Sequence, residues 1–372
     1  MSGEERFRIF GSPRLYVQGP GALGRLSELV GRLGSRPALV TDGDVARLLG
    51  ARLTAALGVA GEGLEPLILT GAVTTPAVAE LARAAAGADV VVAAGGGRAL
   101  DAGKAVALRL GARLVMLPTI ASADAATSRG AVVHEADGRL AVEQLAWNPD
   151  VVLVDTALIA AAPARFLRWG IGDALATRFE MVACVAAGSL TPQGGLPTLA
   201  AMALAEAAYD TVRRDARPAL DAVEAGTPNA ALEAVVEAAL LLSGIGFEGG
   251  GLSIAHSVAV ALTHTPGADR AAHGEHAAYG LLVQLALEDS DAELLDIAGF
   301  AAGIGLPVTL GELGADAVDD AALAALAARV MAAPWPANHP RHPDADDLLG
   351  ALRRVERLEL AARHRRAVPL AG

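Results

Sequence analysis

The residues with the clearest chemistry are one acid and two histidines in three largely apolar segments. Asp173 lies in WGIGDALATRFE, His256 in GGGLSIAHSVAVAL and His273 in AAHGEHAAYG. Each would be costly to bury alone, and one shared cation would satisfy all three. Two imidazoles and one carboxylate with an open fourth position are the ligand set of a catalytic zinc site. A histidine on an apolar helix can instead be a hydrogen-bonded core residue, and spacing does not distinguish His256 from His264 or His273 from His276.

A second candidate site is a glycine turn. The β-branched run VVV at 90–92 leads into glycines at 95–97, and apolar residues then recur at helical spacing. Glycine lets the backbone turn sharply and approach a ligand closely. The unpaired N–H groups at the start of the following helix would face a phosphate. A tight structural turn is the alternative, because the spacing is not G-x-G-x-x-G.

Polar side chains follow two other predicted strands. Asp42 ends RPALVTD, where a carboxylate can accept both ribose hydroxyls of a nucleotide and repel a 2′-phosphate, which favours NAD over NADP. The alternative is an aspartate in a plain strand-ending turn. After RLVML, a loop suited to hydrogen-bonding sugar, phosphate or polyol, or else a capping turn, contains Thr119, Ser122, Asp124, Thr127 and Ser128.

The elements that must position these residues differ between the two parts of the chain. Short strands alternate with amphipathic helices up to about residue 160, which predicts a parallel sheet with helices on both faces. After Pro163 only helical periodicity remains. We therefore expect a Rossmann-like α/β dinucleotide-binding domain over 1–162, an all-α metal- and substrate-binding domain over 163–372, and an active site in the cleft between them. The predicted strands are 36–41, 66–70, 89–94, 113–117 and 151–154; the predicted helices are 21–33, 44–57, 76–86, 98–110, 199–211, 229–242, 251–262, 276–287 and 317–331.

Composition restricts the partners. The net charge is −12 over 372 residues and no block of basic residues occurs, which argues against a nucleic-acid partner. The single cysteine, Cys184, excludes an internal disulfide and CxxC metal sites. Residues 181–205 are uncharged, but a Thr-Pro-Gln-Gly-Gly turn at 191–195 predicts two buried helical pieces rather than a membrane span. We expect a cytoplasmic protein.

Six motifs in order resemble glycerol dehydrogenases of the metal-dependent (iron-containing) alcohol dehydrogenase superfamily. They cover about residues 95 to 280, with a weaker similarity before them. The motifs are GGGRALDAGK (95–104), PTIASADAATS (118–128), NPDVVLVDTALIAAAP (148–163), GIGDALATRFE (170–180), LSGIGFEGGGLSIAHS (242–257) and HGEHAAYG (273–280).

The resemblance implies a dehydroquinate synthase-like architecture, an NAD cofactor, one divalent metal and a homo-oligomer. By motif position the metal ligands would be Asp173, His256 and His273, with Asp124 facing the substrate. Thr177 stands where iron-dependent relatives are expected to carry another histidine, which favours zinc. The implied cofactor contacts are Asp42, Gly96, Gly97, Arg98, Asp101, Thr119, Ser122 and Ser128.

Three departures from the family pattern weaken the choice of substrate. Arg98 stands where lysine is usual, and His134 where a tyrosine is expected near the cofactor. The segment ANHPRHPDADD at 337–347 replaces a proline-glycine loop and contains two histidines.

The implied reaction is reversible hydride transfer between NAD and a secondary alcohol such as glycerol or a related polyol or diol. The proton could leave through water, or through His264 or His276. One alternative is a glycerol-1-phosphate dehydrogenase or dehydroquinate-synthase-like cyclase, which would need cations at the metal, where only Arg178 and Arg270 are close in sequence. The other is a non-catalytic nucleotide-binding protein.

Overall fold

The protein is described by a computed structural model over residues 7–135 and 140–367. Its contacts define two compact units. Among the described residues, the sheet unit contains 11–167 and 215–245, and the helical unit contains 7–10, 168–214 and 246–367. The division is therefore not a single cut after residue 162, because residues 215–245 group with the sheet. The assignment of cofactor and metal functions to two domains stays a prediction.

The sheet unit is built on six parallel strands in the order β1-β8-β5-β4-β2-β3. This confirms the predicted α/β fold. The central strands are buried along their length, which explains their continuous apolar sequences. The strands are β1 (Tyr16–Gly19), β2 (Pro37–Asp42), β3 (Leu67–Leu69), β4 (Val90–Gly95), β5 (Arg113–Pro118) and β8 (Val151–Asp155).

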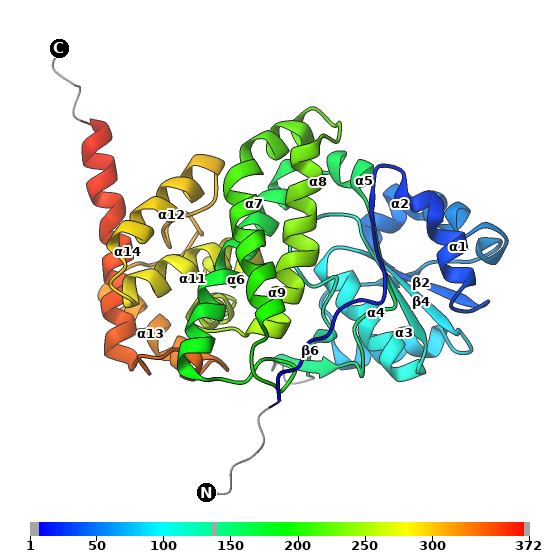
Figure 1. The fold of residues 1–372 in the computed structure, drawn as a ribbon, viewed down its shortest axis with the longest axis horizontal. Helices are drawn as coiled ribbons and strands as arrows, with labels where there is room; N and C mark the ends of the chain where they lie inside the picture. Colours follow the sequence, from blue (N-terminus) through cyan, green and yellow to red (C-terminus); the bar gives the residue numbers. More distant parts are fainter. Residues whose placement is uncertain (1–6, 136–139, 368–372) are drawn as a thin grey trace, which may run out of the picture. The chain divides into compact units, whose positions relative to one another are not determined.

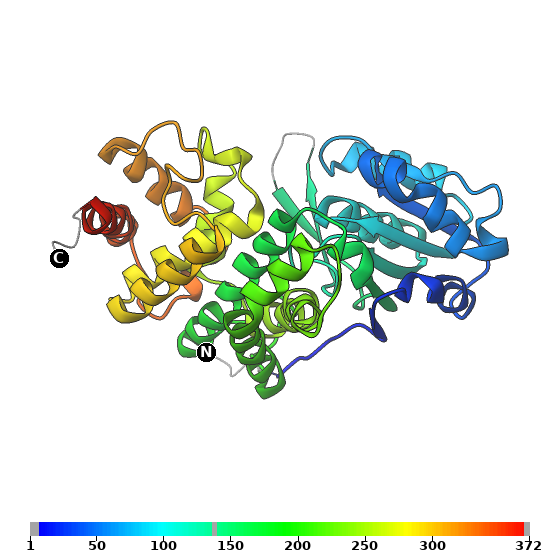
Figure 2. The same ribbon diagram turned by 90° about the horizontal axis from the view of Figure 1, so that it is seen from above.

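Helices cover both faces of this sheet (Figures 1 and 2). Alternate strand residues such as Val90 and Val92 pack with Leu26 of α1 and Leu53 of α2. On the opposite face Gly103 of α4 packs against Ala93. The helices of this unit are η1 (Ala22–Arg25), α1 (Leu26–Gly31), α2 (Gly43–Ala56), η2 (Gly58–Gly61), α3 (Thr75–Ala84), α4 (Gly97–Leu110), α5 (Thr156–Ala160), α8 (Ala230–Glu237) and the π-helix η3 (Ala238–Leu242).

A separate antiparallel hairpin extends the sheet unit. It pairs β6 (Gly130–His134) with β7 (Leu140–Gln144). The prediction from sequence omitted these two strands and β1, because none of them is a continuous apolar run.

The carboxyl ends of β2, β4 and β5 meet at one edge of the sheet. Gly95 pairs in register with Pro118, and the backbone N–H of Thr119 donates to the carbonyl of Gly95 over 3.1 Å. β2 neighbours β4 on its other side and ends at Asp42. The topology therefore brings Asp42, the glycine turn and the loop after residue 118 together, as ligand sites in open α/β sheets require.

The helical unit consists of long helices, as predicted for the C-terminal region. In this unit α14 lies beside α11 and α13 (Figure 1). The chain passes from one unit to the other inside each of three helices, α6, α7 and α9. The helices are α6 (Ala164–Ala187), α7 (Leu199–Glu224), α9 (Ser243–Gly250), α10 (Ile254–Leu262), η4 (Ala268–Arg270), α11 (His273–Leu287), α12 (Asp291–Ile304), α13 (Asp320–Met331), η5 (Pro336–Asn338) and α14 (Ala345–Ala367).

The long uncharged stretch forms parts of two helices joined by a turn, as predicted, but the two pieces are only partly buried, since Val182 and Leu199 are 54% and 77% exposed. Residues 181–187 end α6, and α7 begins at Leu199. Between them the backbone N–H of Thr191 donates to Gly195 over 2.8 Å. Among the described residues one other segment, Ala230–Gly250, is long and apolar enough to cross a membrane by length and composition alone, and 56% of its apolar window is buried. Core helices of globular proteins also meet this criterion.

Candidate active site

The structure brings Asp173, His256 and His273 together in the helical unit. Asp173 comes from α6, His256 from α10, and His273 is the first residue of α11. Asp173 Oδ1 lies 3.4 Å from Nε2 of His256 and 3.2 Å from Nε2 of His273. One potential ligand atom from each residue lies within 4.8 Å of the others. Two nitrogens and one oxygen converging in this way fit a divalent metal ion with an open coordination position.

The geometry distinguishes the histidines that spacing could not. His264 is exposed just beyond α10, and it is not part of the cluster found among the described residues. His276 is buried and its Nε2 donates to the carbonyl of Ala268 over 2.8 Å. Burial lowers the pKa of His276 to about 4, so this side chain is neutral at physiological pH. The predicted ligand pair, His256 and His273, is the pair that the fold places beside Asp173.

A second carboxylate, Glu180, was not predicted from sequence and lies behind His256. Both oxygens of Glu180 accept hydrogen bonds from the His256 region, and Oε2 contacts the ring Nδ1. Glu180 and Asp173 are seven residues apart on α6, which puts them on one helix face. This spacing within an apolar segment is the signal that could have identified Glu180.

The buried charges shift one another's pKa values. Burial alone would raise the pKa of Asp173, but the histidines His273 and His256 outweigh this effect and lower it. Burial alone would lower the pKa of His256, but Glu180 and Asp173 raise it well above its ordinary value. A carboxylate that stays ionised beside two imidazoles is the electrostatic environment that a divalent cation requires.

Thr177 lies one helical turn after Asp173 and is fully buried. Its Cγ2 lies 3.1 Å from where a Cβ on Gly246 would stand. A threonine offers no imidazole nitrogen, so Thr177 adds no histidine ligand to Asp173, His256 and His273.

The glycine turn of the sheet unit leads directly from β4 into α4. Gly96 is the N-cap residue of α4, and no side chain caps this helix. Its first N–H groups are therefore oriented as in an anion-binding helix start. A Cβ on Gly96 would lie 2.8 Å from Ile120, whereas Gly97 has open space around it. Arg98 is exposed next to the turn, with Nη1 3.5 Å from the carbonyl of Gly71.

The two carboxylate oxygens of Asp42 have different surroundings. Oδ1 accepts the backbone N–H groups of Asp44 and Val45 and so caps α2. Oδ2 lies 3.1 Å from where a Cβ on Gly95 would stand, at the glycine turn. The carboxylate is thus a helix cap that also faces the predicted phosphate turn.

A fully buried lysine ties two predicted cofactor residues together. Lys104 Nζ lies 2.6 Å from the carbonyl of Gly130, 3.1 Å from Oγ of Ser128 and 3.5 Å from Oδ1 of Asp101. Ser128 and Asp101 therefore help to hold the loop and α4 in place around Lys104. The sequence analysis gave Lys104 no role of its own.

The loop after β5 is anchored within the sheet unit. Asp124 is buried, and its Oδ2 accepts a hydrogen bond from Ser243 over 2.9 Å. Thr127 donates to the carbonyl of Leu240 over 3.0 Å. Gly244 permits this approach, because a Cβ there would lie 2.0 Å from the Thr127 hydroxyl oxygen. Ser243 was missed because it follows Asp124 by more than a hundred residues and lies in an apolar segment.

Of the remaining predicted residues, Thr119 is buried, Ser122 is partly exposed, and His134 ends β6. The backbone N–H of His134 donates to the carbonyl of Val73 over 2.8 Å.

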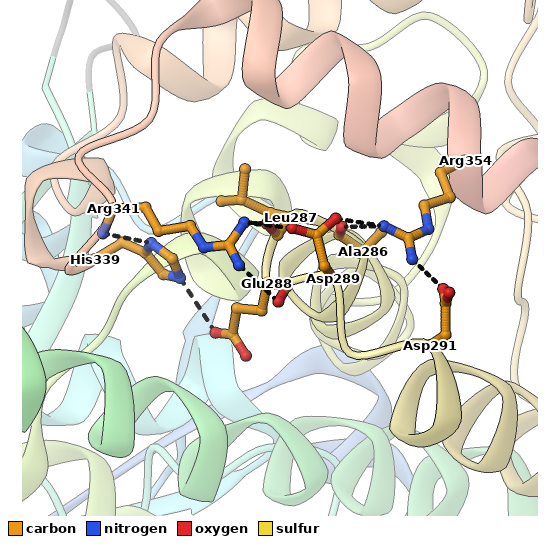
Figure 3. A network of polar contacts seen from close by, with 8 residues as sticks. All are labelled: Ala286, Leu287, Glu288, Asp289, Asp291, His339, Arg341 and Arg354. Carbon is orange, nitrogen blue, oxygen red and sulfur yellow. Dashed lines mark hydrogen bonds and ion pairs between the residues drawn. The ribbon is translucent and has the colours of Figure 1, made fainter.

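The unusual segment at 337–347 is held against α11 (Figure 3). His339 Nε2 lies 3.1 Å from Glu288, and Arg341 donates to the carbonyls of Leu287 and Glu288. Arg341 therefore caps the C-terminal end of the helix whose first residue is His273. Just before this segment, the Trp335 ring stands edge-on to the His256 ring with centroids 6.4 Å apart.

The chain is similar to known proteins in sequence and in fold. Residues 13–156 match the family model described as iron-containing alcohol dehydrogenase. The chain is 42% identical to a glycolaldehyde reductase of Halobacterium salinarum over 82% of this chain and 85% of the relative. It is 39% identical to a glycerol dehydrogenase of Escherichia coli over 82% and 84% of the two chains.

A solved structure of glycerol dehydrogenase from Schizosaccharomyces pombe superimposes with a TM-score of 0.90 at 31% identity, covering 98% of this chain and 94% of that one. Sequence and fold agree over most of the length of these proteins. The chain is therefore an oxidoreductase that belongs to the iron-containing alcohol dehydrogenase family.

Proposed function

We propose that the protein is an NAD-dependent, zinc-dependent dehydrogenase that interconverts a small polyol, of the glycerol type, and its ketone. The observation that carries this proposal is the convergence of Asp173, His256 and His273. The names of the similar proteins, glycerol dehydrogenase and glycolaldehyde reductase, support a small hydroxylated substrate.

Asp173, His256 and His273 would hold the metal ion. When bound, zinc supplies a Lewis acid that lowers the pKa of an alcohol hydroxyl. Glu180 contacts Nδ1 of His256, so Nε2 is the ring nitrogen of His256 that faces Asp173 and would bind the metal. The choice of zinc over iron rests on the family resemblance, since Thr177 stands where iron-dependent relatives are expected to carry another histidine.

The sheet unit would hold the cofactor. The N–H groups at the start of α4 would bind its pyrophosphate, and Asp42 would accept from the adenosine ribose hydroxyls. When bound, NAD⁺ supplies the acceptor for the hydride that leaves the alcohol carbon. The hydroxyl proton would pass to solvent, because burial lowers the pKa of His276 too far for it to hold that proton, and His264 is not part of the cluster found among the described residues.

Asp124 would orient the substrate through a hydroxyl group that does not react. Ser243 fixes one of its carboxylate oxygens, so the side chain is positioned before substrate binds. A carboxylate favours a neutral polyol over a phosphorylated one, because like charges repel in a buried site. Arg178, one of the two arginines close in sequence to the cluster, forms an ion pair with Glu206.

Steady-state kinetics with zinc-loaded protein tests the proposal. We expect activity with glycerol and related vicinal diols, with NAD preferred over NADP, and we expect Asp42→Gly to reduce that preference. Activity with glycerol 1-phosphate but not with free polyols would contradict the choice of substrate. An unchanged cofactor preference in Asp42→Gly would remove the role assigned to Asp42.

A further inference from the structure

Glu180 makes contacts that a purely space-filling buried carboxylate would not need. It is fully buried on α6, as is Asp173 two helical turns before it. Its Oε1 accepts the backbone N–H groups of Ser253 and His256, both over 2.8 Å. Its Oε2 contacts Nδ1 of the His256 ring.

The first of these contacts replaces a missing helix cap. No side chain of α10 itself caps its N-terminus, and the Ser253 side chain makes no cap bond. The N–H of His256 belongs to the first turn of α10, and Glu180 accepts it from a different helix. A negative charge at this end of a helix is also favourable to the helix dipole.

The second contact fixes the state of the imidazole. An ionised carboxylate can only accept hydrogen bonds, so the ring nitrogen that faces it must carry the proton. The Nδ1 proton is then fixed, and Nε2, which lies 3.4 Å from Asp173 Oδ1, is the ring atom left to bind a metal once it gives up its own proton. Carboxylates that hold a histidine ligand in this way raise the metal affinity of a site.

We propose that Glu180 is a positioning residue that holds His256 in the Nδ1–H tautomer and thereby sets the affinity of the site for a divalent cation. This inference rests on the proposed metal-binding function. It makes no use of the cofactor and assigns Glu180 no contact with substrate.

The variant Glu180→Gln separates the two contacts. The amide oxygen of the introduced side chain can still accept both backbone N–H groups, so the cap of α10 is kept. The amide nitrogen then faces Nδ1, and two donors cannot bond to each other. His256 must move its proton to Nε2, the atom that would bind the metal.

Glu356→Gln is the matched control. Glu356 Oε1 likewise accepts two hydrogen bonds, from the Tyr279 hydroxyl over 2.8 Å and from the backbone N–H of Leu310 over 3.1 Å. Exchanging it for glutamine therefore keeps the acceptor oxygen and removes a charge from the same helical unit. Glu180→Asp, which keeps the carboxylate, is the conservative variant.

The test is zinc affinity measured by competition with a chromophoric chelator on metal-stripped protein, together with the visible spectrum of the cobalt(II)-substituted forms. For Glu180→Gln we expect zinc binding weaker by about 10–100-fold and a changed cobalt spectrum, with wild-type affinity in Glu356→Gln and partial recovery in Glu180→Asp. Thermal unfolding of the metal-free proteins checks that all variants are folded.

The outcomes separate this inference from the function on which it rests. Wild-type protein that binds no zinc would overturn the proposed function. Wild-type protein that binds zinc, with equal affinity in Glu180→Gln, would overturn the role of Glu180 and leave that function intact. An equal loss of zinc affinity in Glu180→Gln and Glu356→Gln would show a general effect of removing a negative charge and would also overturn the inference.

Discussion

Asp124 is the residue at which substrate choice is most directly tested. Its carboxylate is buried and held by Ser243, so it presents a fixed acceptor. In Asp124→Asn we expect kcat/KM for glycerol to fall by about 100-fold, because a misplaced hydroxyl costs about that much. Oxidation of 2-propanol, which has no second hydroxyl to orient, should change little. Steady-state kinetics with both alcohols measures this; equal losses would contradict the orienting role.

His276 makes stability depend on pH in a direction that its burial determines. In the folded protein its pKa is lowered from 6.5 to about 4, mainly by burial. Between these values the unfolded chain binds the proton and the folded protein does not, so stability falls as the pH drops from 6.5 to 4. The contribution lost over this window is at most about 3 kcal/mol.

His276→Gln should remove this part of the pH dependence, because glutamine does not titrate and can still donate to the Ala268 carbonyl. Chemical denaturation of the metal-free proteins at pH 7 and pH 4.5 gives the two free energies of unfolding for each. If the free energy of unfolding of His276→Gln changed between these two pH values as much as that of the wild type, His276 would not be the source of this pH dependence.

At the scale of elements, the strand–turn–helix from β4 to α4 was predictable and its packing was not. The run at 90–92 predicted the strand, and the glycines predicted the turn. That Gly103 lies at a close approach of α4 to the sheet was not predictable, because a glycine inside a helical pattern does not indicate what lies opposite. The structure shows that a Cβ on Gly103 would lie 2.2 Å from the Cβ of Ala93.

Gly103→Ala should therefore destabilise the protein by about 1–3 kcal/mol through overpacking, although alanine is the better helix former. Gly31→Ala is the control, since a Cβ on Gly31 meets nothing within 4 Å. Urea denaturation compares the two variants. If the free energy of unfolding of Gly103→Ala equalled that of the wild type and of Gly31→Ala, the packing described for α4 would be contradicted.

Two residues of the site could not be predicted from the sequence, for similar physical reasons. Glu180 lies in an apolar segment, and its role depends on α10 packing against α6, which periodicity does not report. Ser243 reaches Asp124 only because residues 215–245 join the sheet unit. A helical pattern predicts a helix but not the body against which it packs. Three polar residues in apolar segments predicted a shared cation, whereas the choice of His256 and His273 came from the family resemblance, and the ligand set stays a prediction.

At the scale of the whole molecule, the chain keeps the family fold over nearly its full length. Two features of the whole chain stay predictions: the homo-oligomer and the cytoplasmic location. The helical unit has exposed apolar side chains, among them Phe7 (65% exposed), Val182 (54%) and Leu199 (77%). A contact between subunits would bury such side chains. The absence of a nucleic-acid partner, expected from the net charge of −12, likewise stays a prediction.

The central claim is that one metal ion held by Asp173, His256 and His273 is required for alcohol oxidation. The most direct measurement is zinc content and glycerol oxidation of wild type and His256→Ala side by side, with circular dichroism to confirm folding. We predict one zinc ion per wild-type chain, and in His256→Ala a loss of affinity beyond the roughly 100-fold expected for an outer-shell partner, with activity falling in parallel. Full zinc content and full activity in a folded His256→Ala would contradict the account.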